Sequence, residues 1–440
     1  MARKFIDEFI SSEEKEIIEP TSDYNAFPDK DLLEKLRNEI IQKLIDNNLE
    51  KHEKLDDYVK NQIDKITSLY DLNPSQMNYI YNLIDNEISG YGPLTELLKD
   101  KDITEIMVNG PDEIYIELNG HIIKDESVSF VNDEHIVRIV QRMVQPLGRN
   151  IDIAHPMVDA RLDDGSRLNA VLSPLSLNGP VVTIRKFKRE LANIEDFLRT
   201  GTLTPYMARF LEAAVEAKLN ILIVGGTGSG KTTLLNVLSS FCNSDERIIT
   251  IEDAAELKLK QKHVISLETR TKSYEGKGSI TIRDLVINSL RMRPDRIIVG
   301  EVRGKEAFDM LQAMNTGHEG SMTTLHANST QDALNRLETM VLMNGVEIPV
   351  MAIREYIESA IDIVVQTQRF SDGKRRVSSI SEIIGMKNGE ILQKEIFKYK
   401  QTGVSDTGSV LGEFLMYKRI PKVYSKIKAK SITTLDGMFE

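Results

Sequence analysis

The sequence has 440 residues but only one cysteine, Cys242, and no tryptophan. A single cysteine excludes an internal disulfide and a four-cysteine zinc module within the chain. No run approaches the roughly 20 apolar residues of a membrane-spanning helix, and the N-terminus turns acidic too early for a secretory signal. We therefore expect a cytoplasmic protein, which would reach a membrane only peripherally, through a partner.

A basic surplus is also missing, since the formal net charge is −11. An acidic balance argues against non-specific binding of a phosphate backbone, so no direct nucleic-acid partner is expected. The apolar and charged fractions, 41% and 28%, are ordinary for a globular protein. The length favours about three domains.

The N-terminal part divides into a polar and a helical segment. Residues 1–28 are polar and read as a flexible tail. Residues 29–89 carry apolar side chains at spacings of three and four, which predicts a helical bundle. These stripes include Leu33, Leu36, Ile40 and Leu44, followed by Leu55, Val59, Ile63 and Ile66. They either pack on each other or form a docking surface for a partner.

Residues 90–188 show a different periodicity, after the turn residues Gly90, Gly92 and Pro93. Asn119-Gly120 is a strong hairpin-turn signal. The predicted strands cover 103–108, 113–118, 158–162, 167–172 and 181–187, and a helix covers 135–146. This mixture of short strands and one long helix predicts an α+β domain.

A charged stretch at 189–204 reads as a linker between domains. From there to residue 440, helical segments alternate with short apolar strands and glycine-rich loops. This alternation predicts an α/β domain with a mainly parallel sheet.

The apolar strand 221–224 runs into GGTGSGKTT, and a helix follows. The pattern G-x-x-x-x-G-K-T in this setting predicts a phosphate-binding loop for ATP with Mg²⁺. Lys231 should reach the β- and γ-phosphates, and the Thr232 hydroxyl should ligate Mg²⁺. The candidate nucleotide-binding residues are Gly225, Gly226, Thr227, Gly228, Ser229, Gly230, Lys231, Thr232 and Thr233.

Carboxylates follow two further predicted strands. Strand 247–251 ends in Glu252-Asp253, and strand 296–299 ends in Gly300-Glu301. At the carboxyl edge of a parallel sheet they can orient a water at the γ-phosphate or hold Mg²⁺ through its water shell. We predict catalytic roles for Glu252 and Glu301, the latter with Mg²⁺ bound through water. The alternative is that they cap loops or pair with lysines.

Two histidines lie close in the sequence GHEGSMTTLHAN. The predicted helix 307–316 should stop at Gly317, which places His318 in a loop, and strand 321–325 should deliver His326. Shared metal binding is not favoured, since one histidine lies in a loop and no cysteine is near. His326 is predicted to sense the γ-phosphate, and a structural histidine is the alternative.

The ordered set of motifs is more specific than the loop alone. It runs GYGPLTELL, EIMVNGPDEIYIE, DARLDDGSRLNA, TIRKF, GGTGSGKTT, IEDAAELKL, RPDRIIVGEVRG and TGHEGSMTTLHAN. Over about residues 90–386 the chain resembles the secretion and pilus-assembly ATPases, the superfamily of type II and type IV secretion motors. Within it, the chain is most similar to the CpaF type of the tight-adherence (Flp) pilus.

The resemblance implies a RecA-like P-loop NTPase motor domain, here 205–440, after a PAS-like α+β domain, here 90–188. It also implies a hexameric ring with nucleotide between the two domains. Arginines of the first domain would then reach the phosphates, and the matching residues are Arg161, Arg167 and Arg185. They could also be ordinary surface arginines.

The same resemblance assigns the other motifs. The acidic box of the superfamily reads Gly-Glu, as at Gly300-Glu301. Glu252 matches its Asp box, and His318 and His326 match its His box. Type II relatives carry a tetracysteine zinc domain, which this chain cannot form, so the CpaF or conjugation-type branch is favoured.

The predicted function is a homo-hexameric ATPase that powers pilus assembly on inner-membrane platform proteins. One alternative is export of protein or DNA through a conjugation-type type IV secretion channel. Less favoured alternatives are a nucleic-acid translocase and a nucleotide switch that does not hydrolyse ATP.

Overall fold

A computed structural model describes residues 90–439, apart from 119–120, 188–192, 271–277, 346–347 and 407, together with Asn82, Asn86 and Glu87. The chain divides into two compact units, Met1–Lys188 and Arg189–Glu440, and each is described by itself. The predicted tail, nearly all of the predicted helical bundle and the Asn119-Gly120 turn lie outside the described residues.

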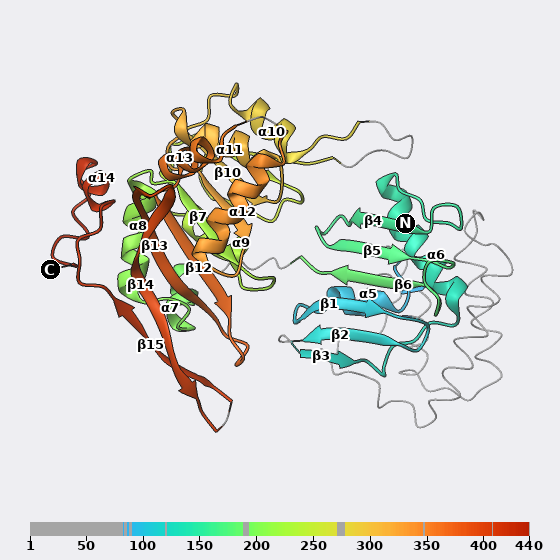
Figure 1. Ribbon diagram of the computed structural model, residues 1–440. Helices are drawn as coiled ribbons and strands as arrows, with labels where there is room; N and C mark the ends of the chain where they lie inside the picture. The colour runs from blue at the N-terminus through green and yellow to red at the C-terminus, as the bar shows by residue number, and fades with distance from the viewer. Residues whose placement is uncertain are drawn as a thin grey trace, which may run out of the picture. The chain divides into compact units, whose positions relative to one another are not determined.

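The first unit is built on a six-stranded antiparallel sheet in the order β3-β2-β1-β6-β5-β4 (Figure 1). Its strands are β1 (Ile103–Val108), β2 (Ile114–Leu118), β3 (His121–Lys124), β4 (Met157–Arg161), β5 (Arg167–Val171) and β6 (Val181–Arg185). The described helices are α5 (Leu94–Lys99), α6 (Asp133–Val144) and the short η3 (Gln145–Leu147). The predicted α+β mixture is therefore confirmed for this unit.

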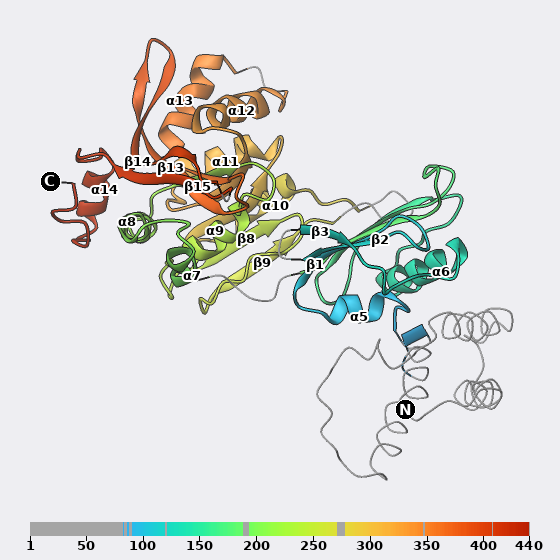
Figure 2. The same ribbon diagram turned by 90° about the horizontal axis from the view of Figure 1, so that it is seen from below.

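Helix α6 covers one face of this sheet (Figure 2). The Asn132 side chain caps its N-terminus by accepting a hydrogen bond from the His135 backbone N–H at 2.9 Å. Ile136, Ile139 and Val140 then face the sheet, each at most 1% exposed. On the opposite face of the sheet, side chains between the buried strand positions are more exposed, and Asp159, Asn169 and Arg185 are among them.

The second unit is a mixed α/β structure on a nine-stranded sheet in the order β15-β14-β13-β12-β7-β11-β10-β8-β9. The six strands β12, β7, β11, β10, β8 and β9 are paired in parallel. On the other side of β12, the strands β13, β14 and β15 are each antiparallel to the strand before them. The strands are β7 (Ile221–Gly225), β8 (Ile248–Glu252), β9 (Val264–Glu268), β10 (Arg296–Val302), β11 (Met322–His326), β12 (Ile363–Arg369), β13 (Arg375–Lys387), β14 (Glu390–Val404) and β15 (Val410–Met416).

The antiparallel extension was not expected from the sequence, which predicts a mainly parallel sheet through to residue 440. Short turns without a crossover helix join β12 to β15, so each strand folds back on the one before it. The predicted parallel part itself is confirmed.

Helices cover both faces of the parallel strands. In β7, Ile221 and Ile223 pack into one core with α8 and α9, whereas Leu222 and Val224 pack into another with α10 to α13. Burial on both faces explains why this strand is apolar throughout. The helices are α7 (Ile194–Arg199), α8 (Pro205–Glu216), α9 (Lys231–Ser239), α10 (Ile282–Ser289), α11 (Glu306–Asn315), α12 (Thr330–Leu342), α13 (Val350–Ala360) and α14 (Tyr424–Ala429).

The second half of the predicted linker, 189–204, is folded onto the second unit. It forms α7, which begins with a capping box between Asn193 and Asp196. Phe197 and Leu203 join the core beside α8. The sequence did not indicate this short helix, because the stretch is mostly charged and polar. Its few apolar residues pack against the core of the second unit.

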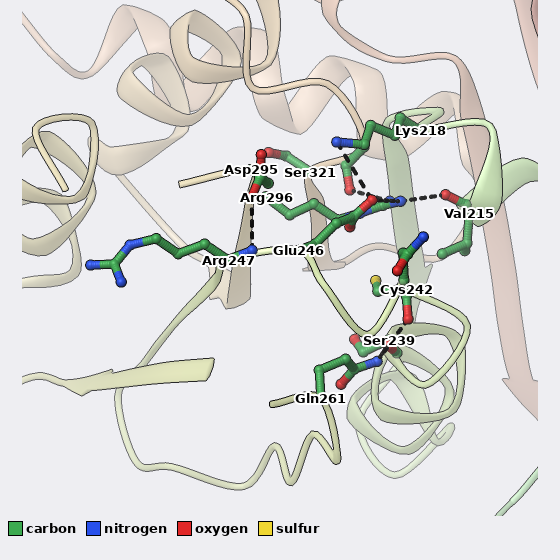
Figure 3. A network of polar contacts seen from close by, with 12 residues as sticks. Val215, Lys218, Ser239, Cys242, Glu246, Arg247, Gln261, Asp295, Arg296 and Ser321 are labelled. Carbon is green, nitrogen blue, oxygen red and sulfur yellow. Dashed lines mark hydrogen bonds and ion pairs between the residues drawn. The ribbon is translucent and has the colours of Figure 1, made fainter. Parts of the chain in front are cut away.

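A buried arginine ties together the amino ends of the parallel strands (Figure 3). Arg296, the first residue of β10, is fully buried, and its Nε donates to the Glu246 carboxylate. Its Nη2 donates to the Val215 carbonyl at 2.6 Å and its Nη1 to the Gly320 carbonyl at 3.1 Å. Lys218 reaches the same carboxylate at 3.5 Å, so the buried charge is compensated.

Asn220 joins the neighbouring strands at the same edge. Its side-chain oxygen accepts from the backbone N–H groups of Gly320 and Ser321 at 2.9 and 3.0 Å. Its Nδ2 donates to the Ala360 carbonyl at 2.7 Å, and its own N–H donates to Asp362 at 2.9 Å. These bonds fix the starts of β7, β11 and β12, which leaves the carboxyl edge to the loops that carry the candidate site.

Candidate nucleotide-binding site

The predicted strand, loop and helix of the phosphate-binding loop are present. Strand β7 ends at Gly225, and α9 begins at Lys231 after Gly230, whose φ is 95°. A Cβ on Gly225 would lie 2.3 Å from the Thr367 carbonyl oxygen and 2.5 Å from the Ser229 Oγ. Glycine is therefore required at the start of the loop, because neighbouring strand β12 approaches its backbone.

Lys231 lies within the curve of the loop. Its Nζ donates to the carbonyls of Gly225 and Gly226 at 3.0 and 2.9 Å. Burial lowers the pKa of the Lys231 ammonium below its ordinary value, the Glu301 carboxylate opposes this shift, and Arg303 adds to it. The lysine therefore shares one electrostatic environment with the second acidic motif.

The other loop residues fit a phosphate chain. Thr227 and Gly228 are exposed at the tip of the loop. Thr232 and Thr233 follow Lys231 in the first turn of α9, where backbone N–H groups and the helix dipole favour an anion. The Thr232 hydroxyl is a hard oxygen ligand of the type Mg²⁺ prefers. This donor set fits ATP and Mg²⁺.

Glu252 ends strand β8 and is only 3% exposed. Its Oε1 accepts from the backbone N–H groups of Glu256 and Leu257 at 2.9 and 3.1 Å. A Cβ on Gly300 in the neighbouring strand would lie 2.9 Å from the Glu252 Cγ. The glycine that stands where many phosphate-loop proteins have aspartate thus makes room for the Glu252 side chain.

Glu301 follows Gly300 in β10, and its side chain is 24% exposed. Arg303 donates to its Oε2 from Nε at 2.8 Å and from Nη2 at 2.5 Å. The Nη1 of the same arginine lies 3.6 Å from Asp253. Arg303 therefore connects the two acidic motifs, a role that the sequence reasoning missed although the residue stands two positions after Glu301.

The two histidines lie at opposite ends of β11. His326 ends the strand and is paired in register with Gly225 of the loop strand. His318 precedes the strand, and its carbonyl accepts from the Ser321 hydroxyl at 2.8 Å, beside the Arg296 cluster. They cannot share a metal. Among the described residues, no group of three or more His, Cys, Asp or Glu side chains is arranged to hold one.

The three candidate arginines form one row across the first unit. Arg161 of β4 pairs directly with Arg167 of β5, which pairs with Arg185 of β6. They alternate with buried residues such as Leu168 and so lie on the face away from the core. Three guanidinium-bearing residues therefore lie side by side on this face. The row and the loop belong to different units.

A second arginine that the sequence reasoning missed is the first residue of β13, directly after the turn from β12. Arg375 donates from Nε to the Gly228 carbonyl of the loop at 2.9 Å. On the neighbouring strand, the Thr367 hydroxyl lies 3.0 Å from that of Ser229. Both contacts join residues more than 130 positions apart, so no local sequence signal could have indicated them.

A phosphate-binding loop on a parallel sheet, with carboxylates at neighbouring strand ends, defines a P-loop nucleotide hydrolase. Residues 87–408 match the family model described as type II/IV secretion system protein. The match covers well over half of the chain, and the chain belongs to this family. It is an ATP hydrolase.

Similar proteins include a putative conjugal transfer protein of Mycobacterium tuberculosis, which is 33% identical over 76% of this chain and 95% of its own length. The type IV secretion system protein VirB11 of Brucella suis is 33% identical over 66% of this chain and 88% of its own length. The crystal structure of the Brucella suis VirB11 ATPase covers 66% of this chain and 95% of that one, with 30% identity and a TM-score of 0.37.

Proposed function

We propose that the chain is a RecA-like motor with a PAS-like first unit, and that it hydrolyses ATP to drive motion between the units. The arrangement of Lys231, Glu301 and Arg303 around the loop carries this proposal. The strand order supports the RecA-like assignment, since β11 separates the loop strand β7 from the acidic strand β10.

We assign each residue of the site a separate role in ATP binding or hydrolysis. Lys231 would bind the β- and γ-phosphates, and Thr232 would hold Mg²⁺ together with Glu301, the latter through a water. Mg²⁺, when bound, neutralises charge on the phosphates. Glu252, fixed by two backbone N–H groups, orients the water that attacks the γ-phosphorus. The new P–O bond forms as the bond to the β-phosphate oxygen breaks, and a carboxylate takes the water proton.

The arginine row suggests how the site is completed. We assign Arg161, Arg167 and Arg185 to the phosphates of a nucleotide held by a neighbouring subunit of a homo-hexamer. Arginine supplied in trans stabilises the charge of the transition state. His326, beside Gly225 in the sheet, would transmit the state of the γ-phosphate to the strands.

ATP turnover tests the loop. Lys231→Ala and Glu301→Ala should each lower kcat by about a hundredfold or more, the loss typical of a group that stabilises transition-state charge. Lys262→Ala, an exposed lysine in the same unit, is the matched control and should keep wild-type turnover. Wild-type activity in Lys231→Ala would show that the site is wrongly assigned.

Mixing variants tests the arrangement in trans. Arg185→Ala and Lys231→Ala subunits, each inactive alone, should regain part of the activity when mixed, because some interfaces then combine an intact arginine with an intact loop. No recovery in assemblies that size measurements show to be mixed would exclude an arginine supplied by the neighbour.

There are two candidates for the secretion or assembly system that the ATPase powers. We propose pilus assembly of the CpaF type on an inner-membrane platform, with the ATPase peripheral at the cytoplasmic face. Among the described residues, no helix has the length and apolarity to cross a bilayer. Export through a conjugation-type channel is the second candidate, supported by the conjugal-transfer and type IV secretion relatives. Deletion of the gene should abolish pili in the first case and DNA or protein transfer in the second.

A further inference from the structure

The turn between β12 and β13 lies against the phosphate-binding loop. Arg375, the first residue of β13, donates from Nε to the Gly228 carbonyl at 2.9 Å. Its Cδ would lie 3.3 Å from a Cβ on Gly230, so the side chain runs across the loop toward the start of α9. That helix N-terminus is where the phosphates of a nucleotide are expected.

The turn that precedes Arg375 is held in place by contacts of the neighbouring residues. Arg376 forms a two-contact ion pair with Asp372, at 2.9 and 3.2 Å. It also lies over the rings of Phe370 and Tyr399, about 5 Å from each centroid. Asp372 in turn accepts from the backbone N–H groups of Lys374 and Val410. These contacts support the turn, and Arg375 directly after it lies against the loop.

Strand β12 holds the loop at a second point. Thr367 is paired in register with Gly225, and its hydroxyl lies 3.0 Å from the Ser229 hydroxyl. The hairpin thus contacts the loop at its first glycine, at Ser229 and at Gly228. A shift of the hairpin relative to the loop is opposed at each of these contacts, which keeps the guanidinium over the same part of the loop.

The guanidinium has hydrogen-bond capacity left over. It carries five N–H donors, and the Nε contact is its one hydrogen bond within the part of the chain that the structure describes. Arg369 pairs with Arg375 across the turn and is a second cation beside it. A cation whose forked end is unused, beside a like charge and a helix N-terminus, is suited to an anion with several oxygens.

We propose that Arg375 binds the phosphate chain of the nucleotide held by the loop of its own subunit. This inference rests on the proposed function of the loop. It differs from the role of the arginine row of the first unit, because Arg375 belongs to the same unit as the loop. Its contribution is therefore made to bound ADP as well as ATP, and it strengthens binding more than it speeds hydrolysis.

Titration of the purified full-length chain tests the proposal, with Mg²⁺-ADP and Mg²⁺-pyrophosphate as the two probes. A charge-assisted hydrogen bond corresponds to roughly a 10- to 100-fold change in affinity. Arg375→Ala should weaken both probes by that factor. Lys374→Ala removes the same charge from the same turn without touching the loop, and it should stay within about twofold of wild type.

Pyrophosphate lacks the base and the ribose of ADP, so it distinguishes a contact of Arg375 with the phosphates from a contact with the base or ribose. Unchanged pyrophosphate affinity in Arg375→Ala, together with weaker ADP binding, would move the contact to the base or ribose and overturn the proposal. An equal loss of affinity in Lys374→Ala would show that the effect comes from positive charge in general, and this result would also overturn the proposal.

Arg375→Gln separates binding from support of the loop. Its amide can still donate to the Gly228 carbonyl, but it carries no charge, so it should lose as much affinity as Arg375→Ala. Wild-type affinity in Arg375→Gln would show that the residue only supports the loop. Lys231→Ala distinguishes a failure of the proposed function: if it binds ADP as wild type does, the loop is not the nucleotide site at all.

Discussion

Gly300→Ala is expected to destabilise the protein through one side chain, that of Glu252. The added Cβ would lie 2.9 Å from the Glu252 Cγ and 3.5 Å from its Cβ and Oε1. Strand β10 is held between β8 and β11, so its backbone has little freedom to withdraw. The Glu252 side chain must move instead, and its carboxylate leaves the N–H groups of Glu256 and Leu257.

The size of the effect follows from two contributions. Overpacking in a dense interior costs about 1–3 kcal/mol, and each hydrogen bond to a carboxylate contributes about 1.5–3 kcal/mol. Since the carboxylate can regain part of its hydrogen bonding from water, we expect a loss of about 2 kcal/mol in the free energy of unfolding. ATP turnover should fall as well, because the Glu252 carboxylate, to which we assign the orientation of the attacking water, is displaced.

A double-mutant cycle measured by denaturant unfolding isolates this mechanism. In the Glu252→Ala background the added methyl group has room, so Gly300→Ala should cost less than about 0.5 kcal/mol, which leaves a coupling energy of more than about 1 kcal/mol. Gly304→Ala is the matched control, because its Cβ would meet only the Glu306 Oε2, at an ordinary 3.5 Å. An equal cost of Gly300→Ala in both backgrounds would refute the steric explanation.

Two further predictions concern the supports of the site. The Arg376 guanidinium holds the pKa of Asp372 at about 2, below its unfolded value of about 3.9, so the stabilisation is present above about pH 4 and is lost as pH falls toward 2. Asp372→Asn should therefore be less stable than wild type at pH 7 and equal to it near pH 2, and a constant difference across this range would contradict the assignment. Asn220→Ala leaves two backbone N–H groups and the Ala360 carbonyl buried without their partner. It should cost about 3 kcal/mol of unfolding free energy, and a loss below about 1 kcal/mol would show that water replaces the side chain.

The local elements could be predicted because their signals are local. The loop motif, the apolar run of β7 and the glycine at the end of α11 each act through neighbouring residues. The predicted ends of β8 and β10 correctly placed Glu252 and Glu301 at one edge of the sheet, since parallel strands end on the same side.

Some features were not predicted, because the short sequence signals for them were ambiguous. The linker prediction missed α7, because a polar stretch with a single buried aromatic residue, Phe197, gives little periodicity. The parallel-sheet prediction missed the antiparallel extension, because apolar strands joined by turns do not reveal which neighbour they pair with.

The sequence by itself determined that a nucleotide-binding loop follows β7 and that carboxylates stand near it, because glycine conformation and strand periodicity depend on few residues. Only the tertiary structure decided which groups surround that loop. Register places Thr367 and His326 on either side of Gly225, and the hairpin brings Arg375 to Gly228 across 147 positions. The tertiary structure also shows that the absence of a side chain at Gly300 leaves room for the side chain of Glu252. Such contacts depend on how strands far apart in the sequence are aligned, and no single segment of the sequence encodes that alignment.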